Sequence, residues 1–239
     1  MPLDFTVALT RTKEDIQKDR LLFEKEGLRV VELPLIEEAC LDFELPDEDY
    51  DYIVFQSPRS AKVFLSRYKP RKEKLIAIGE KTKKVIESYG YEVFAMPEEY
   101  YAKALLELFR GKRGKVLVPR SSVGRMELIE GLEGLGLEVK ALDVYTVKPV
   151  VYQKEEIIDK LRSSRGIFFA SPSAVDGLLA NLQKQEAVEL LKGMFVVCIG
   201  KTTKEYLREV LGLEGLVPEK PSVERVVALF KKLAYNLHK

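Results

Sequence analysis

The chain contains two similar series of short motifs, and this repetition constrains its fold more than any other feature. Residues 55–61 (FQSPRSA) resemble residues 169–175 (FASPSAV), and in both a buried, strand-like run leads into a Ser-Pro pair. Two further pairs follow in the same order: 76–82 with 197–203, and 97–109 with 218–230. An internal duplication of this kind predicts two similar halves, each built from strands and helices.

Short apolar runs alternate with helix starts along the whole chain. The runs lie at 6–10, 28–33, 51–55, 75–79, 115–119, 137–145, 166–170 and 195–200. Alternating strands and helices indicate parallel sheets that are covered by helices on both faces. The sequence therefore predicts an α/β protein with two flavodoxin-like parallel-sheet domains, and ligands of such folds bind outside the carboxyl ends of the strands.

Composition excludes several kinds of chemistry. The single histidine is His238, next to the last of the 239 residues, which makes histidine-based catalysis and a histidine metal site improbable. The two cysteines, Cys40 and Cys198, form no Cys-x-x-Cys pair, and no nucleotide-binding glycine motif is present. We therefore expect neither a metal nor a cofactor.

Charge and hydropathy limit the partners and the location. A net charge of +1 argues against a general nucleic-acid binder. No apolar run approaches the roughly 20 residues of a membrane span, and the N-terminus lacks the features of a signal peptide. We expect a cytoplasmic protein without a membrane partner.

Charge is unevenly distributed in the first half of the chain. Residues 37–51 carry eight acids and no base, whereas residues 59–84 carry ten bases and two acids. The simpler interpretation is a solvated surface of ion pairs, and the alternative is a basic rim that attracts an anionic ligand.

Two pairs of helix starts are candidate anion sites. Ser57 and Ser171 are predicted N-caps, each followed by proline as the first helical residue. Free N–H groups and the helix dipole at such an end favour a carboxylate or a phosphate. Each motif alone is typical of ordinary capping, but their occurrence in register favours binding. The candidates at these starts and at the paired glycine-to-helix turns are Ser57, Arg59, Ser60, Thr82, Ser171, Ser173 and Thr203.

Other candidates follow the first strand of each copy. Arg11 and Arg120 end equivalent strands, Ser121 follows Arg120, and Arg125 is expected on a helix over 123–134. Arginine holds carboxylates through two parallel hydrogen bonds. Tyr145 ends a strand, where its ring can belong to the core or its phenol can donate a proton in place of histidine.

These motifs together resemble the uroporphyrinogen-III synthase family. The residues that carry the resemblance are 9–11, 55–61, 77–82, 124–125, 136–139, 144–146, 169–175 and 198–203. The resemblance implies a lyase that closes linear hydroxymethylbilane into uroporphyrinogen III, with inversion of ring D and loss of water, in haem and sirohaem biosynthesis. It implies that the terminal hydroxyl leaves to give an azafulvene, that a spiro-pyrrolenine follows, and that Tyr145 assists the departure of the hydroxyl.

The resemblance also implies partners and domain boundaries. The substrate carries eight carboxylates, no cofactor is required, the protein is a monomer, and hydroxymethylbilane synthase is a transient partner. The first βα unit is exchanged, so that residues 1–36 join 151–239 while 42–146 form the other domain. Residues 37–41 and 147–150 become a two-stranded linker that permits hinge motion.

Two other functions stay open at this point. A duplicated, non-catalytic binding protein for a small polyanionic ligand would keep the helix starts but would not need Tyr145. A flavodoxin-like transferase acting on a phosphorylated or nucleotide substrate would need a phosphate loop or acidic metal ligands at the strand ends, and the sequence shows neither.

Overall fold

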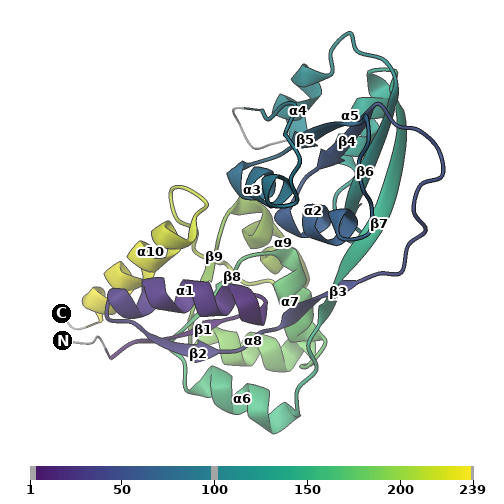
Figure 1. Ribbon diagram of the computed structural model, residues 1–239. Helices are drawn as coiled ribbons and strands as arrows, with labels where there is room; N and C mark the ends of the chain where they lie inside the picture. The colour runs from purple at the N-terminus through teal and green to yellow at the C-terminus, as the bar shows by residue number, and fades with distance from the viewer. Residues whose placement is uncertain (1–3, 98–101, 238–239) are drawn as a thin grey trace. The chain divides into compact units, whose positions relative to one another are not determined.

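The computed structural model describes residues 4–97 and 102–237. His238 and residues 98–101 of the repeated segment 97–109 lie outside these ranges. The chain divides into two compact units: Met1–Glu38 with Lys148–Lys239, hereafter unit 1, and Ala39–Val147, hereafter unit 2. Each unit contains one sheet with helices on both of its faces (Figure 1).

Unit 1 is built on a four-stranded sheet with the order β2-β1-β8-β9. Its strands are β1 (Thr6–Leu9), β2 (Arg29–Glu32), β8 (Gly166–Phe169) and β9 (Phe195–Cys198), and all neighbours are parallel. One face is covered by α1 (Lys13–Lys25) and α10 (Val223–Asn236). The other is covered by α6 (Lys154–Arg162), α7 (Pro172–Leu179), α8 (Lys184–Lys192) and α9 (Lys201–Leu211).

Unit 2 contains a five-stranded sheet with the order β3-β7-β6-β4-β5. Its strands are β3 (Ile36–Cys40), β4 (Tyr52–Phe55), β5 (Lys74–Ala77), β6 (Lys115–Ser121) and β7 (Glu138–Pro149). Helices α2 (Pro58–Leu65) and α3 (Glu80–Ser88) pack on one face. Helices α4 (Ala102–Leu108) and α5 (Glu127–Gly134) pack on the other.

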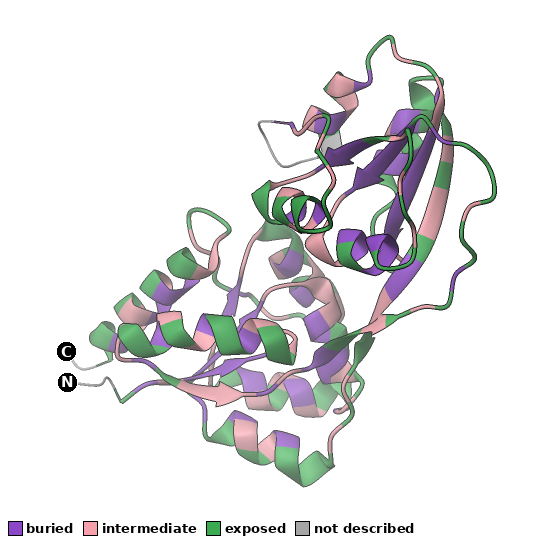
Figure 2. Ribbon diagram, viewed as in Figure 1, coloured by how far each residue is buried: buried purple, intermediate pink, exposed green. Residues whose placement is uncertain are grey.

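The central strands are buried on both sides, which explains their continuous apolar sequences. In β8, Ile167 and Phe169 join the core beneath α6–α9, whereas Phe168 joins the core beneath α1 and α10. Side chains alternate across a strand, so a strand covered on both faces is apolar at every position. Figure 2 shows these strands as buried and the outward faces of the helices as exposed.

The two sheets have corresponding strand orders. The segment β1-α1-β2 corresponds in order to β6-α5-β7, and β4-α2-β5-α3 corresponds to β8-α7-β9-α9. Each sheet combines the first part of one series with the second part of the other. Apart from β3, the neighbouring strands of both sheets run parallel, which confirms the α/β sheets that the sequence predicts.

Strands β3 and β7 carry the chain from one unit to the other. The segments expected to be linkers, 37–41 and 147–150, lie largely within these strands. In unit 1 the Val150 N–H donates to the Leu35 carbonyl (3.0 Å), and in unit 2 the Leu41 N–H donates to the Val144 carbonyl (3.0 Å). These bonds give β3 and β7 opposite directions, because the residue numbers rise on one strand as they fall on the other.

Several acids of the stretch 37–51 form ion pairs within unit 2. Asp42 lies 3.6 Å from Arg67, Glu48 lies 2.8 Å from Lys115, and Asp49 lies 2.7 Å from Lys72. These pairs fit the interpretation of a solvated, salt-bridged surface, where each pair adds at most about 1 kcal/mol. Within the described ranges, no helix is long and apolar enough to cross a membrane.

The two thiols differ sharply in their environment, which predicts their reactivity. Cys40 is exposed, whereas Cys198 is fully buried, and burial raises the pKa of the Cys198 thiol to about 12. At pH 8 the Cys198 thiolate fraction is then about 10⁻⁴, and only the thiolate reacts.

We expect iodoacetamide to label Cys40 alone in the native protein and both thiols in guanidinium, as measured by mass spectrometry. A Cys40→Ser variant should show no fast labelling, and rapid modification of its Cys198 would contradict the buried position.

Candidate functional site

The candidate residues of unit 2 gather at the carboxyl ends of β4 and β6. Helix α2 begins directly after β4, and Ser57 is its N-cap, with its Oγ accepting the Ser60 N–H (3.1 Å). Pro58 takes the first helical position, where a backbone N–H would have no partner within the helix, so its absence costs nothing. The capping that the sequence predicts at this helix is confirmed.

Tyr145 lies beside this helix start. Its phenol oxygen is 3.2 Å from Ser57 Oγ, so the structure joins two candidates that are 88 residues apart in sequence. The side chain is only 8% exposed, and its ring packs in the core beneath α2 and α3. The two alternatives for Tyr145 therefore combine: the ring belongs to the core while the hydroxyl reaches a helix N-terminus.

A β-bulge directs Tyr145 to this face of the sheet. Arg120 is opposite Asp143, but the next residue, Ser121, is opposite Tyr145, so Val144 has no partner in the ladder. In β7, Val139 and Ala141 pack beneath α4 and α5, and regular alternation would point Tyr145 the same way. The bulge reverses the alternation, and Val144 and Tyr145 both join the core beneath α2.

Arg120 is a buried cation with incomplete hydrogen bonding. It is 7% exposed, its Nη2 donates to the Gly124 carbonyl, and its Nη1 lies 3.8 Å from the Asp143 carboxylate. Its Nε and the neighbouring Ser121 Oγ are buried and have no hydrogen-bond partner among the described residues. Because an unsatisfied buried donor costs about 1–3 kcal/mol, an anionic ligand group at these atoms would be stabilised.

Three other candidates of unit 2 occupy different surroundings. Arg59 lines a cavity of about 210 Å³ in which Lys62 and Arg67 share the wall with apolar side chains such as Leu41 and Val63. Ser60 uses its hydroxyl to donate to the Ser57 carbonyl (2.9 Å). Thr82 is buried in the first turn of α3, whose N-cap, Gly79, supplies no side-chain cap.

The structure corrects the expected position of Arg125. The predicted helix over 123–134 begins only at Glu127, and Arg125 is exposed in the preceding turn. The Arg120 guanidinium binds the Gly124 carbonyl, which keeps this stretch in a turn.

Unit 1 repeats the helix starts but not the tyrosine. Ser171 is the N-cap of α7 and accepts the Ala174 N–H (3.3 Å), with Pro172 at the first helical position. Ser173 is half-buried in the first turn of α7, and Thr203 is buried in the first turn of α9. The confirmed cap at Ser171 makes the two helix starts physically alike.

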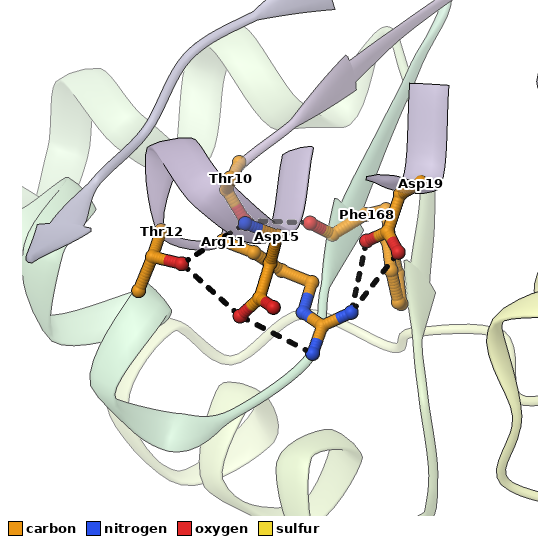
Figure 3. Close-up of polar contacts among 6 residues, drawn as sticks. All are labelled: Thr10, Arg11, Thr12, Asp15, Asp19 and Phe168. Atoms are coloured by element: carbon orange, nitrogen blue, oxygen red, sulfur yellow. Dashed lines mark hydrogen bonds and ion pairs between the residues drawn. The ribbon is translucent and has the colours of Figure 1, made fainter. Parts of the chain in front are cut away.

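The Arg11 guanidinium is already paired with two carboxylates of unit 1. Its Nη1 donates to both carboxylate oxygens of Asp19 (3.1 and 2.9 Å), and its Nη2 lies 3.4 Å from Asp15 (Figure 3). Both acids come from α1, the helix that Thr12 caps. A substrate carboxylate would have to compete with these partners, so the described contacts favour Arg120 over Arg11 as a binding residue.

Sequence reasoning missed two features of the site. One is the bulge at Ser121, which the residue types in β6 and β7 do not predict. The other is the hydrogen bond from Ser122 Oγ to Thr146 Oγ1 (2.8 Å), which ties the ends of β6 and β7 together. The pairing of Arg11 with Asp15 could have been found, because the two are four residues apart at a helix start.

The fold and the site define a two-unit α/β protein that offers hydroxyl, cationic and helix-end groups at the carboxyl ends of parallel strands. A family model described as uroporphyrinogen-III synthase HemD matches residues 18–228. The chain belongs to the uroporphyrinogen-III synthase family, which places it in tetrapyrrole biosynthesis.

Relatives and solved structures agree with this assignment. The chloroplastic uroporphyrinogen-III synthase of Oryza sativa subsp. japonica is 31% identical over 237 residues, covering 91% of this chain and 77% of the rice protein. A uroporphyrinogen-III synthetase structure from Helicobacter pylori has a TM-score of 0.67 at 18% identity, covering 96% of this chain and 99% of that one. A mutant uroporphyrinogen III synthase from Thermus thermophilus has a TM-score of 0.64 at 18% identity, covering 98% of this chain and 99% of that one. The two structures support the fold.

Proposed function

We propose that the protein cyclises hydroxymethylbilane to uroporphyrinogen III, with inversion of ring D and loss of water. The observation that carries this proposal is the Tyr145 phenol, 3.2 Å from Ser57 Oγ, at the strand ends of unit 2. A binding module of the same fold has no need for a phenol placed there by a bulge. Family membership supplies the reaction, and the geometry suggests which group assists it.

The chemistry needs a proton at the departing hydroxyl. The C–O bond of the terminal hydroxymethyl group breaks, and the oxygen leaves as water if an acid supplies a proton. Tyr145 is the group we assign to this role. The azafulvene carbon then bonds to the substituted α-carbon of ring D, which gives a spiro-pyrrolenine. The original bond between ring D and the carbon on ring C breaks, and that carbon bonds to the free α-carbon of ring D, which inverts the ring and closes the macrocycle. The proton lost from this α-carbon, as the pyrrole regains its aromaticity, restores the phenol.

Binding of the substrate carboxylates is assigned to the strand ends. Arg120, Ser121 and the first turn of α2 supply donors in unit 2, and the first turns of α7 and α9 supply N–H groups in unit 1. Because hydroxymethylbilane cyclises spontaneously, orientation of the substrate and electrostatic stabilisation can supply most of the control.

The direct test separates the product isomers. The protein is incubated with hydroxymethylbilane that is generated in the same vessel by its synthase, and the products are resolved by chromatography. We expect uroporphyrinogen III in excess over the spontaneous isomer I. Isomer I alone would overturn the enzyme proposal and favour a non-catalytic polyanion-binding protein.

Arg120 gives a prediction about binding. In Arg120→Lys the charge stays but the planar pair of donors is lost, so we expect KM to rise about tenfold with kcat nearly unchanged. Steady-state kinetics of isomer III formation measures both constants. The matched control is Arg110→Lys, because Arg110 is an exposed arginine paired with Glu107 (2.6 Å). An unchanged KM in Arg120→Lys would limit Arg120 to a structural role.

A further inference from the structure

The Ser57 hydroxyl takes part in two hydrogen bonds at once. Its oxygen accepts the Ser60 N–H at 3.1 Å and lies 3.2 Å from the Tyr145 phenol oxygen. A serine hydroxyl has one proton to donate and two lone pairs. The helix uses one lone pair, and the partial positive charge of the helix end directs the hydroxyl proton away from α2. The Tyr145 oxygen lies within hydrogen-bond distance of this hydroxyl, and either oxygen can donate.

The neighbouring hydroxyl of α2 does not compete for Ser57 Oγ. The Ser60 hydroxyl donates to the Ser57 carbonyl and not to Ser57 Oγ, which contacts the Ser60 N–H and the Tyr145 phenol. The bulge between Arg120 and Ser121 turns Tyr145 toward α2, and the ring is fixed in the core. The distance between the two oxygens is therefore set by the sheet and the helix, not by mobile side chains.

The other unit provides an internal comparison. The two series of motifs align Ser57 with Ser171 and Tyr145 with Ile36. Ser171 caps its helix in the same way, but Ile36 is a buried aliphatic residue that offers no hydrogen bond. Capping is thus common to both units, and the serine–tyrosine contact is a property of unit 2.

From these contacts we propose that Ser57 is a positioning residue for Tyr145, rather than only a helix cap or a substrate ligand. Its hydroxyl donates to the phenol oxygen and so directs the phenol proton away from Ser57, toward the departing hydroxyl. After the proton transfer the same donor stabilises the phenolate, aided by the positive end of α2. This inference rests on the proposed function.

Three variants of Ser57 separate the hydroxyl from the cap. Ser57→Thr keeps both, Ser57→Gly keeps an acceptable N-cap without a hydroxyl, and Ser57→Ala keeps neither. We expect kcat/KM for isomer III to fall about tenfold in the Gly and Ala variants alike and to stay within about threefold in the Thr variant. The alkaline limb of the pH–rate profile should also move to higher pH in Ser57→Gly, because the phenolate has lost a donor.

A double-mutant cycle with Tyr145→Phe tests whether Ser57 acts through Tyr145. In the Phe background, Ser57→Gly should change kcat/KM by less than about twofold. If Ser57→Gly still lowered kcat/KM about tenfold in the Tyr145→Phe background, or changed only KM, the inference would be overturned and Ser57 would be a substrate ligand. A rate that falls in Ser57→Ala but not in Ser57→Gly would also overturn it, since only the cap would then matter.

The cap control is Ser222→Ala. Ser222 caps α10 through the Arg225 N–H (3.2 Å), so its loss removes a bond of the same kind. We expect this variant to lose thermal stability but to keep its kcat/KM. Failure of the proposed function is distinguishable, because the wild-type protein would then produce no isomer III and the Ser57 variants would have no rate to change.

Discussion

Tyr145→Phe should lower kcat/KM for uroporphyrinogen III about 100-fold, the lower end of the range for loss of a general acid. The lower end applies because the substrate is reactive and the remaining donors still orient it. The phenyl ring fills the same place in the core, so the fold should persist. The rate of isomer III formation, measured against the spontaneous isomer I, gives the effect.

The matched control for this change is Tyr152→Phe. The Tyr152 hydroxyl donates to the Pro34 carbonyl (2.7 Å) within unit 1, so this variant loses a phenol hydrogen bond that has no part in the proposed chemistry. It should lose about 1 kcal/mol of stability and keep its full rate. Full activity in Tyr145→Phe, with the control unchanged, would remove the assigned role of Tyr145.

The helix starts could be predicted because their determinants are local. Thr12, Ser57 and Ser171 each bond to an N–H three residues on, and proline after a serine cap occurs within a two-residue motif. Gly27 follows the C-cap of α1 with φ of 79°, a left-handed conformation that favours glycine at this position. These features depend on a few adjacent residues, so the sequence alone specifies them.

The site could be predicted only in part, because its geometry depends on contacts between distant segments. The register of β6 and β7 fixes the bulge, and the bulge decides which face of the sheet Tyr145 takes. Strand periodicity alone would have placed its side chain on the opposite face. Similarly, an arginine at position 11 predicts a carboxylate partner. The sequence does not show that α1 itself provides two such carboxylates, Asp15 and Asp19.

Gly177→Ala should destabilise unit 1 by about 3 kcal/mol, although alanine normally stabilises a helix interior by about 1 kcal/mol relative to glycine. Gly177 lies within α7, and an added Cβ would come 2.2 Å from the Leu35 carbonyl oxygen and 2.9 Å from the Leu35 carbonyl carbon. That carbonyl also accepts the Val150 N–H, so it cannot move without breaking a bond where the chain re-enters unit 1. Thermal unfolding should show a fall in Tm of about 6–12 °C.

Two other helical glycines serve as controls, because they differ from Gly177 in what surrounds them. Gly134, at the end of α5, has no atom within 4 Å of an added Cβ, so Gly134→Ala should be neutral or stabilising by up to about 1 kcal/mol. At Gly131 the added Cβ would come 2.5 Å from the end of the Leu106 side chain, which can rotate away at a smaller cost than a backbone carbonyl. The expected order of Tm is therefore Gly134→Ala above Gly131→Ala above Gly177→Ala. An unchanged Tm in Gly177→Ala would mean that α7 and the Leu35 backbone do not approach so closely in solution.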